Sequence, residues 1–578
     1  SAVVNGKLYA FGGFVDSTFA ATTRSDVYNP ATNAWTRIAD MPQAITHAAT
    51  VVVGSTVWMV GGFVGNHPGP QTANVWKYET TTNTWSAGPS LPAGRGGGAA
   101  AVVGSNLYFY GGLVRDAAGT PILDCGDTWS LNLNGGTTWT TLATMPNARN
   151  HLAGAAVNGL VYAIGGQHFE DEAAGNLAEV DAYNPATNSW SRVADLPVAR
   201  GHTNPSTFVR NGRIVVVGGT KNGDVAMNDV TEYDPATNVW VGLQTLPEGR
   251  KSPVTGLIGD YLYVVGGDNP NPTATGWSGP ISRTWSAGPS LPISLGEVAA
   301  GVVGGKVIVV GEGTSSTLQY NLSTRAWASN LAVRPFVGNH HAAEVVNGKL
   351  YLIGGLGGSS EGKVQIYNPA TNSWSTGASM PYAGGSVSSA VINGEIYVAG
   401  GIVGSATTNQ AAKYNPATNA WTTIAAMPQG VNHAASATDG TRLWVFGGRD
   451  GGNVPSNGFN YVQAYDPATN TWQSSAGGAA LAPLPQARGG MGKAVFAGGE
   501  FYVMGGETST GAGATAKNVY NRVDVYNPST NAWRLATPMP TARHGIFPVW
   551  FAGRVYVPGG GTQAGNSSSA LLEVYDLG

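Results

Sequence analysis

Residues 28–35 read YNPATNAW, and near-copies of this octapeptide recur along the whole chain of 578 residues. The Asn-Pro-Ala-Thr-Asn segment between Tyr and Trp is rich in residues that favour a tight turn. Each copy therefore predicts a strand that ends in Tyr, a turn, and a strand that contains Trp. Tyr precedes Trp by seven positions in nine places: Tyr28/Trp35, Tyr78/Trp85, Tyr183/Trp190, Tyr233/Trp240, Tyr320/Trp327, Tyr367/Trp374, Tyr414/Trp421, Tyr465/Trp472 and Tyr526/Trp533. Spacing this regular indicates a repeat protein.

A pair of glycines that ends an apolar run precedes each octapeptide. The pairs begin at Gly12, Gly61, Gly111, Gly165, Gly218, Gly266, Gly354, Gly400, Gly447, Gly505 and Gly559, and a degenerate copy begins at Gly311. Successive copies lie 43 to 58 residues apart, which is the length of one four-stranded propeller blade. Upstream of the glycines, turns such as Asn5-Gly6 predict a hairpin of two more strands. The repeats therefore predict twelve four-stranded units in an all-β chain.

The combination of Gly-Gly, a spaced Tyr and a Trp seven residues later resembles the kelch repeat family. The resemblance covers essentially the whole chain and implies a β-propeller of six or seven blades per ring. Elementary packing agrees with it, because glycines allow strands to approach closely and large aromatic rings fill the wedge between neighbouring sheets. The Gly, Tyr and Trp positions are therefore expected to be structural.

Twelve repeats favour two six-bladed propellers, which we expect at residues 1–292 and 293–578, with the boundary near Pro292. A division into seven and five blades is the alternative. The last copy ends at Gly578, before its fourth strand. The last blade is therefore expected to lack its outer strand, to have its edge covered by something else, or to receive a strand from a partner.

Composition limits the possible partners and the cellular location. The net charge is −3 with no basic run, which argues against nucleic acid and anionic membranes as partners. No apolar stretch approaches the ~20 residues that span a bilayer. The single cysteine, Cys125, excludes an intramolecular disulfide framework and a zinc site built from several thiolates. Only 11% of residues are charged, a composition typical of a bacterial periplasmic, cell-surface or extracellular protein, and a chain that begins at Ser1 fits a removed signal peptide or a trimmed sequence.

Function is expected on the propeller face that carries the variable loops after Gly-Gly and the connections into the innermost strands. Those connections carry Arg three residues after a Pro at Arg95, Arg149, Arg200, Arg250, Arg488 and Arg543. They carry His five residues after the Pro at His47, His151, His202, His340 and His433, with His544 displaced by one. Several guanidinium groups around one channel would favour a carboxylate, sulfate or phosphate ligand. The alternative is structural, with Arg locked onto carbonyls or a carboxylate of the blade and His acting as a packing group.

The pattern predicts a non-catalytic scaffold that binds a protein or a cell-surface polysaccharide through these loops. No catalytic residue and no metal site is predicted, although Glu170, Asp171 and Glu172 form an acidic loop that could hold Ca²⁺ or simply be solvated. One alternative is an acidic-sugar enzyme resembling sialate mutarotase, for which Glu297 and Glu344 are the candidate bases. The other is a subunit of a homo-oligomer or a larger surface assembly.

Overall fold

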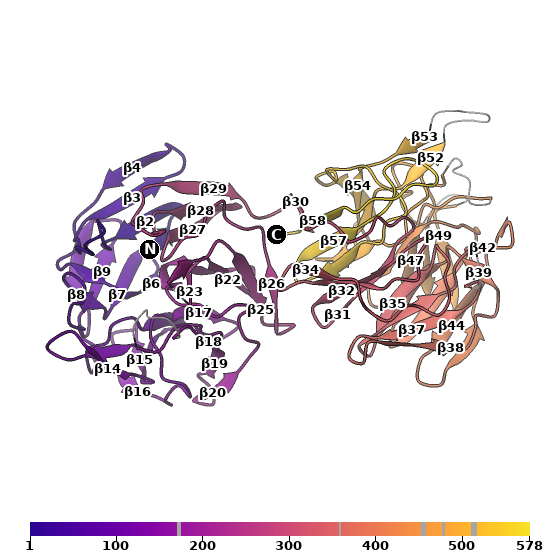
Figure 1. Ribbon diagram of the computed structural model, residues 1–578. Coiled ribbons are helices and arrows are strands. Elements are labelled where there is room, and N and C mark those ends of the chain that lie inside the picture. Colours follow the sequence, from indigo (N-terminus) through magenta and orange to yellow (C-terminus); the bar gives the residue numbers. More distant parts are fainter. Residues whose placement is uncertain (170–174, 223, 358–359, 452–457, 477–479, 510–516) are drawn as a thin grey trace. The chain divides into compact units, whose positions relative to one another are not determined.

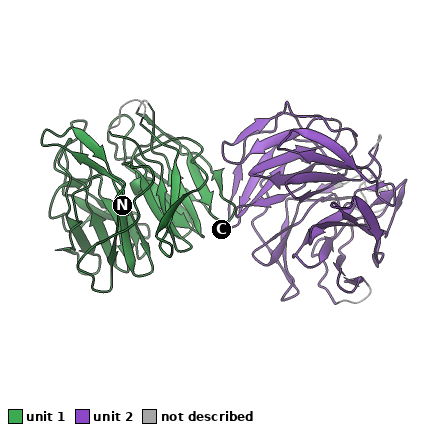
Figure 2. Ribbon diagram, turned by 90° about the horizontal axis from the view of Figure 1, so that it is seen from below, with its two compact units in different colours: residues 1–282 green, residues 283–578 purple. Residues whose placement is uncertain are grey.

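The computed structural model describes residues 1–169, 175–222, 224–357, 360–451, 458–476, 480–509 and 517–578. Their regular structure is almost entirely β, with one short 3-10 helix, η1 (Asn204–Ser206). None of the described residues lies in a helix long and apolar enough to cross a bilayer. The chain forms two compact units, residues 1–282 (unit 1) and 283–578 (unit 2), which are coloured separately in Figure 2.

Unit 1 contains six antiparallel blades, each written from its inner to its outer strand (Figure 1). Blade 1 is β1 (Ala2–Val4), β2 (Lys7–Phe11), β3 (Ser25–Asn29) and β4 (Ala34–Arg37), and blade 2 is β6 (Ala49–Val53), β7 (Thr56–Val60), β9 (Val75–Glu79) and β10 (Thr84–Ala87). Blade 3 is β11 (Ala99–Val103), β12 (Asn106–Tyr110), β15 (Thr128–Asn132) and β16 (Thr140–Thr141), and blade 4 is β17 (Ala153–Val157), β18 (Leu160–Ile164), β19 (Val180–Asn184) and β20 (Ser189–Arg192). Blade 5 is β21 (Thr207–Arg210), β22 (Arg213–Val217), β25 (Val230–Asp234) and β26 (Val239–Gly242), whereas blade 6 has only β27 (Val254–Ile258), β28 (Tyr261–Val265) and β29 (Gly276–Pro280).

Unit 2 contains six four-stranded blades. Blade 7 is β31 (Ala299–Val303), β32 (Lys306–Val310), β33 (Leu318–Asn321) and β34 (Ala326–Ala328), and blade 8 is β35 (Ala342–Val346), β36 (Lys349–Ile353), β37 (Val364–Asn368) and β38 (Ser373–Gly377). Blade 9 is β40 (Ser388–Ile392), β41 (Glu395–Ala399), β44 (Ala411–Asn415) and β45 (Ala420–Thr423), and blade 10 is β46 (Ala435–Thr438), β47 (Leu443–Phe446), β48 (Val462–Asp466) and β49 (Thr471–Ser474). Blade 11 is β50 (Val495–Ala497), β51 (Glu500–Met504), β54 (Val523–Asn527) and β55 (Ala532–Leu535), and blade 12 is β56 (Val549–Phe551), β57 (Arg554–Pro558), β58 (Leu572–Asp576) and β30 (Trp285–Ala287).

The loops after Gly-Gly add small sheets outside the blades. In unit 1 these pair β5 (Ile45–Thr46) with β8 (Phe63–Val64), β13 (Leu113–Arg115) with β14 (Pro121–Asp124), and β23 (Thr220–Lys221) with β24 (Val225–Ala226). In unit 2 they join β39 (Gly384–Gly385), β42 (Ile402–Val403) and β43 (Ala406–Thr407), and they pair β52 (Glu507–Ser509) with β53 (Lys517–Val519). The described loops of this face are therefore partly held by β pairing.

Each unit is a closed ring of six blades. The inner strands of unit 1 contact their neighbours in the order β1, β6, β11, β17, β21, β27 and back to β1. Those of unit 2 do the same in the order β31, β35, β40, β46, β50, β56 and back to β31. The predicted all-β tandem propeller fold is confirmed.

The strand β30 corrects two details of the sequence prediction. It pairs with β58, so that Trp285 lies opposite Tyr575 with ring centroids 4.8 Å apart. The last blade therefore has its outer strand, supplied from the middle of the chain, and it is blade 6 that has three strands. Because this pairing assigns β30 to unit 2, the boundary falls between Ser282 and Arg283 and not near Pro292.

The octapeptide joins each blade to the one before it. Asn83, at the end of its turn, has φ 56° and accepts hydrogen bonds from the Tyr78 hydroxyl (2.8 Å) and from the backbone N–H of Ala39 in the preceding blade (2.7 Å). The indole of Trp85 donates to the carbonyl of the same Ala39 (2.9 Å). We call this arrangement the inter-blade latch. It recurs at Asn188/Trp190, Asn238/Trp240, Asn372/Trp374, Asn419/Trp421, Asn470/Trp472 and Asn531/Trp533.

The first blade shows what happens without a preceding outer strand. Trp35 stands beside Tyr28, with ring centroids 5.3 Å apart, but 42% of it is exposed. Its neighbour in the ring is the three-stranded blade 6, which offers no outer strand to cover the indole. The exposed Trp35 and the short sixth blade therefore have the same origin.

The double glycine is required where blades meet at the channel. Gly61 has φ 65°, and a Cβ there would stand 2.6 Å from the carbonyl oxygen of Arg95 in the connection to the next blade. A side chain at this position would therefore be strained and blocked by backbone.

Candidate ligand-binding site

The predicted arginines lie inside the blades. Arg149 is fully buried, donates to the carbonyls of Gly165 (2.9 Å), Ala163 and Asn147 (both 3.1 Å), and pairs with Asp181 at 2.8 Å. Burial lowers the pKa of Arg149, since removing the charge from water outweighs the attraction of Asp181.

The other predicted arginines are held in the same way. Arg95 pairs with Asp127, Arg200 with Asp229, Arg250 with Glu248, Arg488 with Asp524 and Arg543 with Glu573, and each also donates to backbone carbonyls. None of Arg95, Arg149, Arg200 and Arg250 lines the cavity described below. Of the two roles predicted for the arginines, the geometry favours the structural one.

The histidines of unit 1, by contrast, meet at the channel. His47, His151 and His202 come from the connections into blades 2, 4 and 5, with φ between 51° and 58°. Their backbones join a belt of hydrogen bonds around the channel. In this belt Gly97 N–H donates to His47 O, His151 N–H to Gly97 O, His202 N–H to His151 O, and Ser252 N–H to His202 O. The ring centroids of His151 and His202 are 4.4 Å apart, and that of His47 is 4.7 Å from His151.

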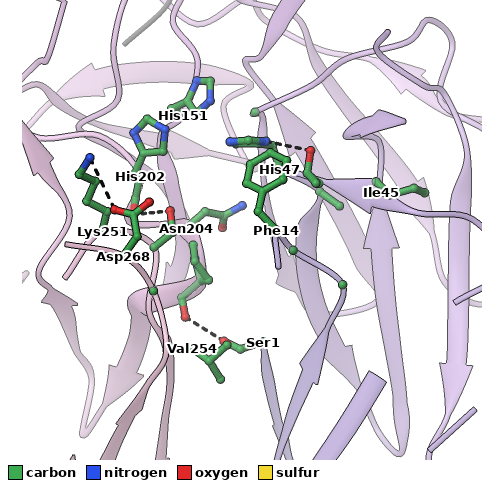
Figure 3. A pocket seen from close by; sticks show the side chains of 18 of the residues that line it. Ser1, Phe14, Ile45, His47, His151, His202, Asn204, Lys251, Val254 and Asp268 are labelled. Carbon is green, nitrogen blue, oxygen red and sulfur yellow. Dashed lines mark hydrogen bonds and ion pairs between the residues drawn. The ribbon is translucent and has the colours of Figure 1, made fainter. Parts of the chain in front are cut away.

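These rings border a cavity of about 460 Å³ on the predicted loop face of unit 1. Its walls are the loops after Gly-Gly, including Phe14 and Phe19, together with the belt and the ends of inner strands. Figure 3 shows His47, His151 and His202 above Asn204, with Lys251 and Asp268 beside them. Aromatic rings, imidazoles and a partly exposed ion pair thus share one concave surface.

The charged groups in this cavity are paired with each other. Lys251 lies 2.5 Å from Asp224 and 3.5 Å from Asp268. Burial raises the pKa of Asp268, because the loss of hydration outweighs the attraction of Lys251. On the opposite side the Arg115 guanidinium lies 3.9 Å from the centre of the Phe63 ring. Comparison of the repeats does not single out these residues, because the residues that follow Arg and Gly-Gly differ from one repeat to the next.

In unit 2, side chains occupy most of the corresponding part of the channel. Its belt positions include Glu297, His340 and His433, and the carboxylate of Glu297 lies 3.0 Å from His340 and 3.5 Å from His544. The remaining cavity is only about 30 Å³ and is bordered by Met491, Ile546 and Phe547, among others. The predicted site residues His340 and His433 are thus brought together, with ring centroids 4.5 Å apart, but with little space between them.

The charges in unit 2 explain the protonation of this cluster. Burial alone would raise the pKa of Glu297, but His340, His544 and Arg449 together hold it at about 2. Burial, reinforced by Arg449, lowers the pKa of His433 well below 6.5. For His544, the neighbouring Glu297 and Glu507 outweigh burial and raise the pKa. Unit 2 therefore carries an internal ion-pair network where unit 1 carries an open cavity.

Two further sequence predictions concern the candidate bases and the acidic loop. Glu344 accepts a hydrogen bond from Ser389 (2.7 Å) and pairs with Lys493 in unit 2, so neither Glu297 nor Glu344 lies in the unit 1 cavity. The acidic loop Glu170, Asp171 and Glu172 lies outside the described residues.

Six of the exposed large apolar side chains among the described residues lie in the variable loops of unit 1. We call them the apolar rim, and they come from the loops after Gly-Gly of blades 1, 3, 4 and 5: Val15, Phe19, Ile122, Leu123, Phe169 and Val225. Both Ile122 and Leu123 are 55% exposed. Large apolar side chains gathered on one face are typical of interaction surfaces.

Comparisons with known proteins agree with the repeat and the fold. A family model described as the KLHDC2/KLHL20/DRC7 Kelch-repeats domain matches residues 46–267, 294–506 and 386–577, and one described as the Kelch motif matches residues 1–42. The chain is 30% identical over 224 residues to Kelch-like protein terF of Aspergillus terreus, covering 38% of this chain and 48% of that protein. It is 31% identical over 96 residues to N-acetylneuraminate epimerase 2 of Escherichia coli, covering 15% of this chain and 26% of that protein.

A solved structure titled "Structure of YjhT" aligns with a TM-score of 0.43 at 18% identity, covering 50% of this chain and 96% of that chain. The chain spans about half the length of its curated relatives, or less.

Proposed function

The chain belongs to the kelch-repeat family, and we propose that it is a non-catalytic scaffold that binds a protein partner through the loop face of unit 1. The observation that carries this proposal is the apolar rim beside a cavity of about 460 Å³. Protein interfaces favour a central pocket with apolar and aromatic anchors. The matching face of unit 2 has a cavity of only about 30 Å³.

A protein is favoured over a polysaccharide by the chemistry of the rim. Phe19, Ile122 and Leu123 are exposed and apolar, and burying one such side chain contributes about 1.5–3 kcal/mol. A polysaccharide would use aromatic platforms and many polar side chains, and the repeat arginines Arg149, Arg200 and Arg250 do not line the cavity where an acidic sugar would bind. Location outside the cell or at its surface is part of the same proposal, and fractionation of the source cells tests it.

The experiment compares capture of a partner by two matched variants of the full chain. In the first, Phe19, Ile122 and Leu123 of the rim are changed to Ser. In the control, three exposed apolar residues near the turns of the opposite face, Val52, Val209 and Tyr261, are changed to Ser.

Proteins retained from an extract of the source organism are identified by mass spectrometry, and their affinities are then measured with purified material. We expect the rim variant to bind at least about tenfold more weakly and the control to bind like the original chain. Equal binding by the rim variant, or an equal loss in the control, would contradict the proposal.

A further inference from the structure

We propose that His47, His151 and His202 of unit 1 form a binding site for a divalent transition-metal ion, of which Zn²⁺ is the best probe. The observation is their convergence from three separate blades onto one point of the channel. One ring nitrogen of each histidine lies within 4.8 Å of the corresponding nitrogens of the other two. Three imidazoles are a ligand set that suits zinc, copper, cobalt and nickel better than Ca²⁺ or Mg²⁺.

The spacing requires only a small adjustment. Zinc–nitrogen bonds of about 2.0–2.1 Å in tetrahedral geometry place the nitrogens about 3.4 Å apart. His47 and His202 are partly exposed to the cavity, so their rings can turn toward the ion. The backbones that carry the rings are fixed by the hydrogen-bonded belt.

A neighbouring side chain sets the orientation of the His151 ring. The Nδ1 atom of His151 is hydrogen-bonded to Oδ1 of Asn150, whose own amide nitrogen donates to Asp124 (2.6 Å) and to the carbonyl of Phe169 (3.0 Å). Because Asn150 uses its nitrogen elsewhere, its oxygen accepts the proton of Nδ1, and Nε2 keeps the lone pair that a metal requires. Such outer partners fix the tautomer of metal-binding histidines.

A glycine in the belt allows the rings to meet. Gly97 lies between His47 and His151 in the belt, has φ 64°, and a Cβ there would stand 3.2 Å from Nδ1 of His151. Any side chain at this position would push against the cluster.

The surroundings leave one coordination position open, and the cavity also contains the guanidinium of Arg115, which lies against the Phe63 ring. Lys251 is neutralised by Asp224 and Asp268, and all three line the same cavity. Three protein ligands leave a fourth position, as in open zinc sites, and the cavity of about 460 Å³ gives it access to a water molecule or to a carboxylate of a bound partner.

Unit 2 supplies an internal control. It repeats the Asn-His pair at Asn432-His433, with Nδ1 of the histidine hydrogen-bonded to the asparagine (2.5 Å). The positive charge of Arg449 acts on His433 and on His340. Glu297 and Glu507 already pair with His340, His544 and Arg449, and the remaining cavity is about 30 Å³, so we expect no comparable site there.

The test titrates Zn²⁺ into the untagged, metal-stripped full chain by calorimetry. We expect uptake of about one ion per chain. His47→Ala, His151→Ala and His202→Ala should each weaken binding by more than about 100-fold, since changing even an outer partner of a metal-binding histidine costs about 10–100-fold. The matched control His433→Ala should bind like the original chain.

X-ray absorption of the zinc-loaded original chain keeps the proposal testable if a variant fails to fold. Three imidazole nitrogens at about 2.0–2.1 Å are expected. Absence of uptake, a shell of oxygen ligands alone, or a loss in His433→Ala equal to that in His151→Ala would overturn the assignment.

Discussion

Arg149 is a fully buried cation surrounded by three carbonyl groups and the carboxylate of Asp181. Each of its three guanidinium nitrogens contacts an acceptor within its own blade or the connection beside it, so it fixes the approach to the inner strand β17. At this scale the arginines of the repeat are structural elements of each blade, and the histidines two residues later are the groups that reach the channel.

Arg149→Ala should therefore destabilise unit 1 rather than weaken ligand binding. Loss of one partner leaves Asp181 and three carbonyls buried without it, at a cost of about 3–5 kcal/mol. Hydrogen exchange of peptides covering β18 and β19 in the full chain measures the effect. The control is Arg192→Ala, whose side chain is 43% exposed, and it should cost less than about 1 kcal/mol. Similar exchange rates in the two variants would speak against this role.

The sequence predicts the positions of the candidate histidines, but it does not predict that their rings converge. The spacing of five residues after Pro predicts that His47, His151 and His202 lie near the channel, because equivalent positions of a repeat lie at equivalent places in a ring. Which rings converge depends on closure of the ring and on small neighbours such as Gly97. Lys251 follows the repeat Arg250 and Asp268 follows the repeat Gly267, but other repeats have different residues there, so only the structure pairs them.

The strand β30 is the element that departs most from the sequence prediction. Its Trp285 lies within residues 1–292, where the repeats predict the first propeller, although no Tyr stands seven residues before it. The structure instead pairs it with β58, where its indole donates to the carbonyl of Thr537 (3.0 Å) as the other latches do. Sequence spacing does not reveal this pairing, since it joins residues far apart along the chain.

Blade 6 is left with an outer edge at β29 that is not extended within unit 1. Two of its five residues are glycine and one is proline, which disfavours the addition of another strand. The Arg250 guanidinium, 4.4 Å from the centre of the Trp277 ring, also packs against this blade. Unit 1 thus closes through contacts of β27 with β1 and β2. Unit 2 closes through blade 12, in which β30 from the start of the unit joins β56, β57 and β58 from its end.

We predict that Trp285→Ala destabilises unit 2 by about 3–5 kcal/mol, the cost of removing a packed Trp. The matched control is Trp35→Ala, because Trp35 occupies the same position in blade 1 but is 42% exposed and has no preceding outer strand. It should cost about 1 kcal/mol. Faster hydrogen exchange in β57 and β58 of the Trp285 variant would report this destabilisation. Unchanged protection of these strands would contradict the pairing of β30 with β58.

At the scale of the whole molecule, two rings with the same repeat differ in what they do with the channel. Unit 1 places three histidines and small residues in its belt and keeps a cavity of about 460 Å³. Unit 2 places Glu297 among its histidines and fills the space with side chains such as Phe547, leaving about 30 Å³. Duplication of one scaffold thus yields one ring suited to binding and one with a self-contained charged centre.

The most direct test measures binding of the partner protein, identified by capture with the full chain, to residues 1–282 and residues 283–578 prepared separately. We predict that residues 1–282 bind the partner with the affinity of the full chain, and that residues 283–578 fold but do not bind it. Binding by residues 283–578, or none by a folded fragment of residues 1–282, would contradict the assignment of the binding face to unit 1.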